Sequence, residues 1–449
     1  MTLLLKNATL VHLHPPGVLA STDVAIEGGL IARVGRSRGA AGPAHPPDRT
    51  LDLAGKVLMP GIVCGHTHFY SALARGVLAR IAPSADFVQT LQNLWWRLDR
   101  AIDREILEAS ALAAALEAVQ RGCTCIVDHH ASPSFIEGSL DVIASCLERV
   151  GLRGVLCYET TDRNGPEGAA AGIGENRRFA RRVEAARLAR GPGAVPALVE
   201  ATIGGHAPFT LGDATLDGLS RVVRETGRGF HVHVCEDAYD ASHSHRVHGQ
   251  DPLARVAAHG LLTDRAIIGH GVHLGAADRE LLVQSGAFLA HNARSNMNNH
   301  VGYQHALPSL PRVALGTDGI GSDMFEEFRA AFFKHRDAGG PLWPGDFARF
   351  LQAGNDLVQR CFGGTFGSIE PGAVADLAVL DYRPPTPLVD ENVAGHLAYG
   401  ISSADVETVI VNGRVVLENR RFPFDTEPVL RQARDAARKL WANMDALEE

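Results

Sequence analysis

Short apolar runs alternate with segments of helical periodicity from residue 57 to residue 336. In the helical segments, apolar residues recur every three to four positions. Residues 103–121 are an example, and Gly122, directly after them, is a typical helix terminator. This alternation predicts a parallel β-sheet with helical crossovers, and eight strands match a (β/α)8 barrel of the TIM type. The predicted strands are residues 57–64, 124–128, 154–158, 199–203, 229–234, 266–269, 287–290 and 313–316.

Both ends of the chain have strand-like patterns instead. Strands are predicted at residues 3–11, 23–34, 376–380, 406–411 and 414–417, with turns at Gly28-Gly29 and Asn412-Gly413 and a loop over residues 35–49. Neither end has enough strands for a stable core alone, so we expect one small discontinuous β-sandwich built from both ends. The expected domains are residues 1–56 and 366–425 for the sandwich, 57–365 for the α/β barrel and 426–449 for a terminal helix.

Composition narrows the functional classes. The chain has 449 residues, is 45% apolar and has a net charge of −8, which disfavours a nucleic-acid partner. No apolar run reaches the length of a membrane-spanning helix, and residues 1–13 lack the features of a signal peptide. The seven cysteines have no C-x-x-C spacing, which suits reduced thiols and a cytoplasmic location.

Polar residues of metal-binding type gather where the predicted strands end. In a barrel of this type, the reactive groups lie at the C-terminal ends of the strands. A single histidine there is more often a satisfied core residue, but the whole set favours a metal site. The residues are His66, His68, Asp128, His129, His130, His206, His233, Glu236, His270 and Asp318.

Two short spacings within this set are informative. His66 and His68 lie two apart, so on a strand they point to the same face and can share one cation. Glu236 follows His233 by three residues, which lets it reach the attacking water as a proton shuttle. The alternative for Glu236 is a surface carboxylate that opens the next loop.

These motifs resemble the amidohydrolase superfamily, in its cytosine deaminase and chlorohydrolase branch. The resemblance rests on His66-Thr-His68, His233-x-x-Glu236, His270, and Asp318 within Gly-Thr-Asp-Gly. Longer strings at residues 72–76, 95–99, 129–133, 291–300 and 332–343 are similar to the SsnA-type aminohydrolases, essentially from end to end. That group tends to be associated with purine catabolism, but the resemblance does not supply its substrate.

The resemblance implies a role for each motif residue. His66, His68, His233 and Asp318 would hold one divalent metal, zinc or alternatively iron, and three imidazoles with one carboxylate leave an open position on zinc for water. Glu236 would be the general acid and base, His270 would orient the water, and Asp318 would count as catalytic as well as a ligand. Lysine is absent between Val57 and Phe333, so a bridging carbamylated lysine, and with it a second metal, is not expected.

For several other residues the sequence allows both a functional and a structural role. His206 lies where relatives place a substrate contact, and His129 or His130 either faces the pocket or makes structural hydrogen bonds. Trp95 and Trp96 either cap a flat ring or serve packing or a subunit contact. The run from Ser295 to His300 suits a polar pocket mouth or turns. The histidines at 243, 245 and 248 are more probable in a solvated loop than in a second metal site.

The leading hypothesis is a hydrolase that attacks an sp² ring carbon of a small nitrogen heterocycle and releases ammonia. Ring opening of a cyclic amide or imidazole and dechlorination are the alternatives, because they differ only in the leaving group. A catalytically inactive barrel would be expected to lack at least one of the six motif residues, and all six are present. We also expect a homodimer or a higher homo-oligomer, with no nucleic-acid or membrane partner.

Overall fold

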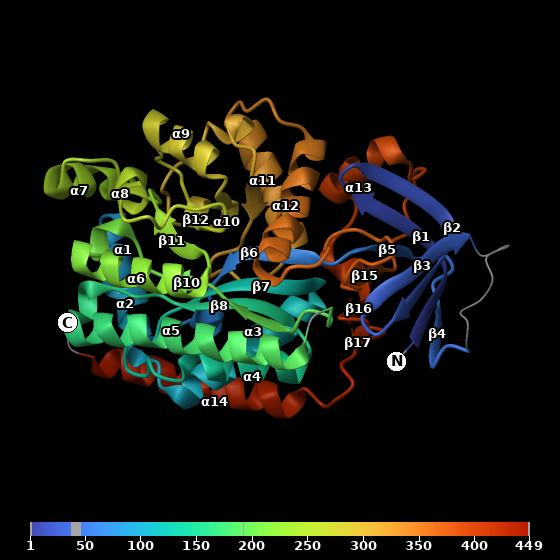
Figure 1. Cartoon of the computed structure of the whole chain (residues 1–449), viewed down its shortest axis with the longest axis horizontal. Coiled ribbons are helices and arrows are strands. Elements are labelled where there is room, and N and C mark those ends of the chain that lie inside the picture. Colours follow the sequence, from blue (N-terminus) through green and yellow to red (C-terminus); the bar gives the residue numbers. More distant parts are fainter. Residues whose placement is uncertain (1, 37–45, 192, 448–449) are drawn as a thin grey trace.

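The fold is described from a computed structural model, which describes residues 2–36, 46–191 and 193–447. Figure 1 shows two parts side by side: a larger body of strands and helices, and a β-sheet that holds the N-terminus. Each part is built from a different kind of strand pairing.

The sheet beside the body is built from both ends of the chain. Its strands follow the order β17-β16-β15-β5-β1-β2-β3. β4 lies off this path and pairs with residues 3–6 of β1, before the part of β1 that pairs with β5. The pairings of β1 with β4 and β5 are parallel and the rest are antiparallel. The strands are β1 (Thr2–Leu13), β2 (Pro16–Glu27), β3 (Leu30–Arg36), β4 (Arg49–Asp52), β5 (Val57–Pro60), β15 (Leu377–Leu380), β16 (Val406–Val411) and β17 (Arg414–Leu417).

Two predictions for this sheet need correction. The apolar run 57–64 is not one strand: β5 pairs with β1 and β15, and only the part after Gly61 enters the body. Gly61 separates the two strands and lies against Thr124, where a Cβ would come within 2.0 Å of Oγ1. The expected loop over residues 35–49 begins inside β3 and ends inside β4, and residues 37–45 lie outside the described residues.

The body contains two parallel sheets, β6-β7-β8-β9 and β10-β11-β12-β13-β14. Only Thr202 separates β9 from β10, and the parallel bridges Thr160–Gly205 and Thr67–Asp318 link the two sheets at both edges. The strands are β6 (Ile62–Thr67), β7 (Cys123–His130), β8 (Arg153–Tyr158), β9 (Val199–Ala201), β10 (Ile203–Gly204), β11 (Phe230–Val234), β12 (Ile267–His270), β13 (Phe288–His291) and β14 (Val313–Leu315).

Helices follow the strands and cover the outside of the body (Figure 1). They are α1 (Phe87–Thr90), α2 (Trp96–Ala101), α3 (Arg104–Gln120), α4 (Ser139–Val150), α5 (Gly165–Arg190), α6 (Asp213–Thr226), α7 (Ala238–His248), α8 (Pro252–Ala258), α9 (Ala276–Ser285), α10 (Ala293–Asn298), α11 (Met324–Asp337), α12 (Pro344–Phe362), α13 (Val393–Tyr399) and α14 (Glu427–Ala446). The sequence analysis did not predict α12 or α13. Gly354, in the middle of α12, lets this helix pack closely against Val63 of β6.

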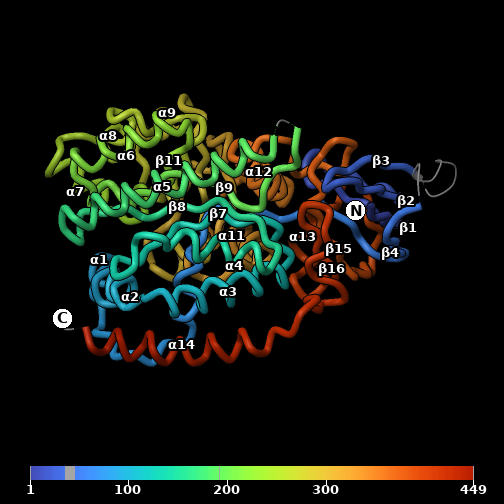
Figure 2. Tube along the Cα trace, turned by 60° about the horizontal axis from the view of Figure 1, so that its bottom comes forward, coloured from blue at the N-terminus to red at the C-terminus, as the bar shows by residue number. Residues whose placement is uncertain are grey.

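The terminal helix α14 packs on the body rather than on the end sheet. Figure 2 shows it running along the outside of α2 and α3, far from the N-terminus. Trp441 donates a hydrogen bond to the carbonyl of Leu73, and Lys439 pairs with Asp103 and Glu105. Within the described residues, no helix is long and apolar enough to cross a membrane.

Candidate active site

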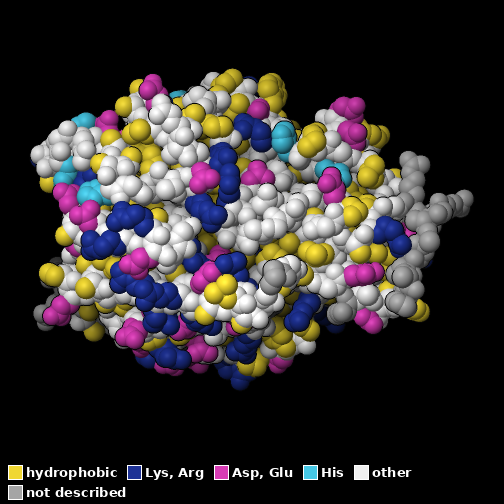
Figure 3. Space-filling view, in the orientation of Figure 1, with side chains coloured by type: hydrophobic (Ala, Val, Ile, Leu, Met, Phe, Trp, Pro, Cys, Tyr) yellow, Lys and Arg dark blue, Asp and Glu magenta, His cyan; other side chains and the backbone are white. Residues whose placement is uncertain are grey.

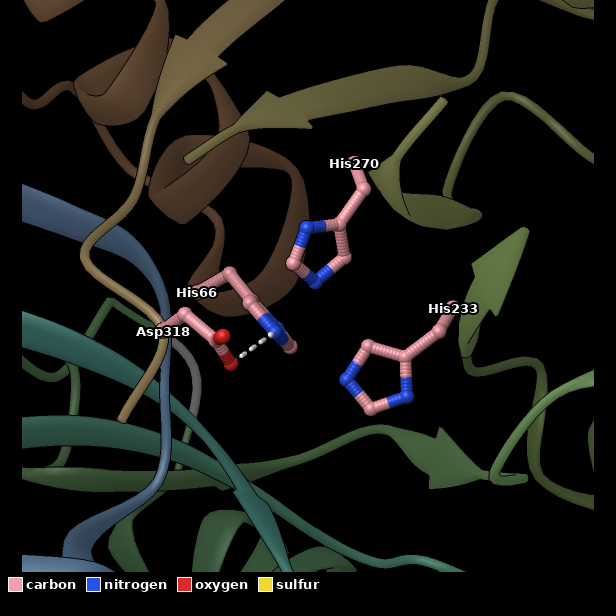
Figure 4. Close-up of side chains that lie close together, drawn as sticks. All are labelled: His66, His233, His270 and Asp318. Atoms are coloured by element: carbon pink, nitrogen blue, oxygen red, sulfur yellow. Dashed lines mark ion pairs between the residues drawn. The ribbon is translucent and has the colours of Figure 1, made fainter. Parts of the chain in front are cut away.

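Residues from four strands converge at one end of the body. His66 lies in β6 with His68 just beyond its last residue, His233 lies in β11, His270 ends β12, and Asp318 follows β14. Figure 4 shows the side chains of His66, His233, His270 and Asp318 pointing toward one another from these separate elements. One ligand atom from each of these four lies within 4.8 Å of the others.

His68 completes the group. Its Nε2 lies 2.8 Å from Oδ1 of Asp318 and 3.3 Å from Nε2 of His233. The Nε2 of His66 lies 3.5 Å from the same carboxylate oxygen. The structure therefore brings together all five of these sequence-predicted residues.

The second ring nitrogen of each histidine tests whether a cation fits between them. Nδ1 of His68 donates to the carbonyl of His129 at 2.5 Å, and Nδ1 of His233 donates to the carbonyl of His206 at 2.9 Å. A carbonyl accepts only, so both rings carry their proton on Nδ1 and turn the lone pair of Nε2 toward the site. The Nε2 atoms of His66 and His270 are buried without a hydrogen-bond partner. This donor set fits one divalent cation.

His231 is a participant that the sequence analysis assigned no role. Its Nε2 lies 2.8 Å from Nδ1 of His66, so the two rings share a proton and fix the orientation of His66. The available signal was its spacing, because His231 and His233 lie two apart on β11 and point to the same face.

The electrostatics favour positive charge between the rings. Burial opposes ionisation of Asp318, but its close contacts with the rings of His66 and His68 hold its pKa well below the usual range. Burial would lower the pKa of His68, yet its contact with the Asp318 carboxylate raises that pKa to about 10. A site that stabilises an imidazolium in this way also stabilises a metal cation.

Glu236 lies beside this group without being part of it. Its Oε2 lies 3.6 Å from Nε2 of His270, and Asn299 donates to its Oε1 at 3.2 Å. Burial raises the pKa of Glu236 to about 6. Cys235, with a positive φ of 52°, turns the chain between β11 and Glu236. A carboxyl group with such a pKa can exchange protons near neutral pH.

The short helix α10 supplies partners to two of the site residues. The hydroxyl of Ser295 donates to Oδ2 of Asp318, and Oδ1 of Asn296 accepts from Nδ1 of His270 at 2.8 Å. The run 295–300, expected at the pocket mouth, therefore mainly orients site residues, although Asn299 also lines the pocket.

A pocket opens beside the candidate metal ligands. Its wall combines carboxylates with aromatic side chains, among them Phe87, Trp95, Trp96, Phe209 and Tyr239. His206 lines it as well, with Nδ1 2.7 Å from Oγ1 of Thr210. Both tryptophans thus face the pocket, which the sequence had left open.

The remaining candidates lie away from the pocket surface. His129 is fully buried, with Nε2 donating to the carbonyl of His231 at 3.2 Å, and His130 bonds Ser132 at 2.8 Å. Asp128 accepts from the backbone of Phe69 at 2.7 Å. Of the three histidines on α7, His245 pairs with Asp251 at 2.7 Å. None of the three belongs to the ligand groups found in the described part of the chain.

Known proteins resemble the whole chain. It is 31% identical to a 5-methylthioadenosine/S-adenosylhomocysteine deaminase of Desulforudis audaxviator, over 98% of this chain and 99% of that protein. It is 28% identical to a 5'-deoxyadenosine deaminase of Methanosarcina acetivorans, over 99% of each. The crystal structure of a zinc-bound adenosine deaminase from Xanthomonas campestris superposes with a TM-score of 0.81, at 26% identity and 98% coverage of both chains.

A sequence profile agrees with these relatives. The profile of the Amidohydrolase family matches residues 57–416, which include every residue of the candidate metal group and Glu236. This confirms the resemblance noted from the motifs, and the chain belongs to the amidohydrolase family.

Proposed function

We propose that this chain is a metal-dependent aminohydrolase that releases ammonia from a purine-related heterocycle. It is a hydrolase acting on carbon–nitrogen bonds other than peptide bonds. The observation that carries the proposal is the meeting of four histidines, Asp318 and Glu236 at the end of one aromatic pocket.

His66, His68, His233 and Asp318 hold one divalent ion. Zinc suits this set of imidazole nitrogens and one carboxylate better than calcium or magnesium, which prefer oxygen ligands. The zinc bound by the Xanthomonas deaminase supports the same choice. When bound, the ion would lower the pKa of a water molecule and so make it a nucleophile for the ring carbon.

The chain's own residues handle the protons. Glu236 takes a proton from the attacking water and returns one to the departing nitrogen as ammonia leaves. His270 orients that water against the ring carbon, and the hydrogen bond from its Nδ1 to Asn296 fixes the imidazole ring. Asn299 keeps the carboxylate of Glu236 turned toward His270.

The substrate is a flat, purine-related ring that enters between aromatic walls. Trp95, Trp96 and Phe209 supply ring faces for stacking, and His206 supplies a polar contact at the pocket wall. The named substrates of the relatives are adenosine derivatives, which supports an aminopurine or its nucleoside here.

We infer the finer architecture from the same contacts. Counting β9 and β10 as one strand interrupted at Thr202, the body has eight parallel strands, and the two bridges support closure into a (β/α)8 barrel. The end sheet folds on a core that includes Leu5, Leu58 and Ile410, which supports a β-sandwich drawn from both chain ends. The domain limits 1–56, 57–365, 366–425 and 426–449 stay predictions. Within them, the chain passes from the end sheet to the body at Gly61 rather than at residue 57.

A homo-oligomer also stays a proposal. Exposed aromatic side chains support a protein contact: Tyr399 is 68% exposed and its ring lies 6.0 Å from that of Phe333, which is 47% exposed. Size-exclusion chromatography with light scattering would show a single monomer peak if this proposal is wrong.

Ammonia release tests the activity. Protein purified without added metal would be incubated with adenosine, 5'-deoxyadenosine, 5-methylthioadenosine, adenine and guanine, and its metal content measured by elemental analysis. We expect ammonia from at least one substrate and about one zinc per chain. A second set of possible ligand atoms, from His68, His129, Glu159 and His233, shares His68 and His233 with the four proposed ligands, so two ions cannot both be fully held.

Three results would contradict the proposal. No ammonia from any purine would reject deamination, and chloride release from a chlorotriazine without ammonia would favour the dechlorination alternative. A reproducible content near two metals per chain would reject the single-ion site.

A further inference from the structure

A large groove lies at the end of the body opposite the candidate active site. It has a volume of about 1070 Å³ and is lined by residues near the starts of β9, β11, β12, β13 and β14, by α5 and α12, and by His14 in the turn between β1 and β2. Because these body strands are parallel, the groove meets their N-terminal ends, whereas His233, His270 and Asp318 lie near or beyond their C-terminal ends. Among the described residues, none lines both the groove and the active-site pocket.

Positive charge prevails in this groove. Three carboxylates line it, from Glu184, Glu200 and Asp356, together with twice as many guanidinium groups. We call it the arginine groove after the residues that carry those groups: Arg187, Arg228, Arg265, Arg312, Arg349 and Arg360. The whole chain has a net charge of −8, so this local excess runs against the overall charge.

Half of these arginines already have a carboxylate partner. The pairs are Arg187 with Glu184 at 2.6 Å, Arg228 with Glu200 at 2.8 Å, and Arg360 with Asp264 at 3.3 Å. Two of the three carboxylates that line the groove are therefore already engaged, and little negative charge is left for the other arginines.

The other three arginines form no ion pair within the described residues. Arg312 donates from Nη1 to the carbonyl of Gly286 at 2.6 Å and lies over the ring of Phe288, 5.4 Å from its centre. Arg349 donates from Nη1 to the carbonyl of Pro311 at 3.3 Å. A guanidinium has five N–H donors, so these contacts hold each group in place but leave donors and the full charge available.

The three unpaired arginines also lie close together. Arg265 comes just before β12 and Arg312 directly before β14, and β13 pairs with both of these strands. Neighbouring strands lie about 4.8 Å apart, so the two backbones are separated by about 10 Å. Arg349 reaches residue 311, which is next to Arg312. Side chains as long as arginine can therefore converge on one small anion.

We propose that the arginine groove binds a small anion with at least two phosphate groups, contacted by Arg265, Arg312 and Arg349. The planar fork of a guanidinium matches a phosphate group and binds it through two parallel hydrogen bonds. Positive charges gathered at one place repel each other, and a multivalent anion removes this repulsion. This ligand site goes beyond the proposed hydrolase activity and does not depend on it.

Two sources have this chemistry. One is a nucleoside diphosphate or triphosphate, and the other is inorganic pyrophosphate. The volume of the groove is large enough for a whole nucleotide, since pockets for small molecules usually measure about 300–1,000 Å³.

Isothermal titration calorimetry with pyrophosphate tests the site. Wild-type protein should bind about one pyrophosphate per chain, and Arg265→Gln or Arg349→Gln should each weaken binding by about 10-fold, because each removes charge-assisted hydrogen bonds. Arg431→Gln removes the same charge at an exposed position of α14 outside the groove, so this matched control should bind like the wild type. Arg265 is exposed, which makes its variant safe for folding.

Uridine diphosphate distinguishes the two sources, because its base is not a purine of the kind proposed for the active-site pocket. Tighter binding of uridine diphosphate than of pyrophosphate, weakened by the same groove variants, identifies a nucleotide as the ligand. Tighter binding of pyrophosphate identifies the inorganic anion.

Thermal unfolding gives a second readout, because a ligand that binds only the folded state raises the melting temperature. Pyrophosphate should raise that of the wild type and of Arg431→Gln, but not that of the double variant Arg265→Gln/Arg349→Gln. The proposal is overturned if neither phosphate compound binds, if the groove variants bind as well as the wild type, or if Arg431→Gln loses as much affinity as they do. None of these measurements needs ammonia release, so they stand apart from the test of the deaminase.

Discussion

Glu236 and His233 lie three residues apart on one short segment but contribute differently. Glu236 contacts His270 and Asn299 and lies outside the ligand group, whereas His233 turns its Nε2 into that group. Glu236→Gln should therefore keep the metal while kcat falls by about 10² to 10⁴, the usual cost of losing general acid–base catalysis. His233→Ala should lose metal and activity together, because it removes a ligand. Elemental analysis with steady-state kinetics checks both; a Gln variant without metal would make Glu236 a ligand.

The pKa of Glu236 also predicts a pH dependence. Burial raises this pKa to about 6, and the group accepts a proton from water only when it is ionised. As the pH falls through about 6 the carboxylate becomes protonated, so kcat/KM should fall on the acid side. The residual activity of Glu236→Gln should lack this limb. A limb that persists unchanged in the Gln variant would assign it to another group.

At the scale of the element, α10 holds proposed catalytic side chains of other elements in place. Asn296 fixes the ring of His270, so Asn296→Leu should let that ring rotate and lower kcat by about 10-fold or more, in line with a lost hydrogen bond of about 1–2 kcal/mol. Metal content should not change, because Asn296 touches none of the four proposed ligands. Asn296→Asp keeps an acceptor for Nδ1 and should retain more activity.

The matched control on this element is Asn298→Leu, at an exposed position whose amide reaches only Asn299. It should leave kcat within about twofold of wild type, since a surface substitution rarely changes the free energy by more than about 0.5 kcal/mol. Equal losses in the Asn296 and Asn298 variants would indicate that α10 simply tolerates no change.

At the scale of the whole molecule, the buried pair of Arg153 and Asp376 joins the body to the end sheet. Arg153 is fully buried at the start of β8, and Asp376 directly precedes β15. Asp376→Asn leaves a buried guanidinium without its countercharge, which should lower the free energy of unfolding by about 3–5 kcal/mol. Denaturant-induced unfolding would measure this. Asp337→Asn, which breaks an exposed pair with Lys334, should leave the midpoint almost unchanged.

Positive and negative side chains are intermixed on the molecular surface rather than separated into patches of one charge. On the face in Figure 3, Lys and Arg side chains are interspersed with Asp and Glu. Ion pairs of α5, such as Arg187 with Glu184 and Arg178 with Asp141, likewise bring opposite charges together. The face shown therefore offers no broad basic surface of the kind that binds a polyanion.

The sequence alone determined the residues that the structure gathers at the site. His66, His68, His233, His270 and Asp318 could be found because each follows or ends an apolar run, and strand ends are readable from local patterning. Glu236 could be found from its spacing to His233. The Asn412-Gly413 turn was equally local, and both residues have the positive φ that such a tight hairpin turn needs.

Only the tertiary structure decided which groups support those residues. His231, Ser295 and Asn296 act through contacts with side chains 23 to 165 positions away in the chain, and no periodicity encodes such a contact. The arginine groove forms because the segments before β12 and β14 meet α12 in the folded body. Likewise β5 joined the end sheet because it pairs with β1 and β15, and the apolar run 57–64 does not itself encode those partners. The hydrophobic pattern indicates which residues are buried, but only the packing of the fold decides which partners they contact.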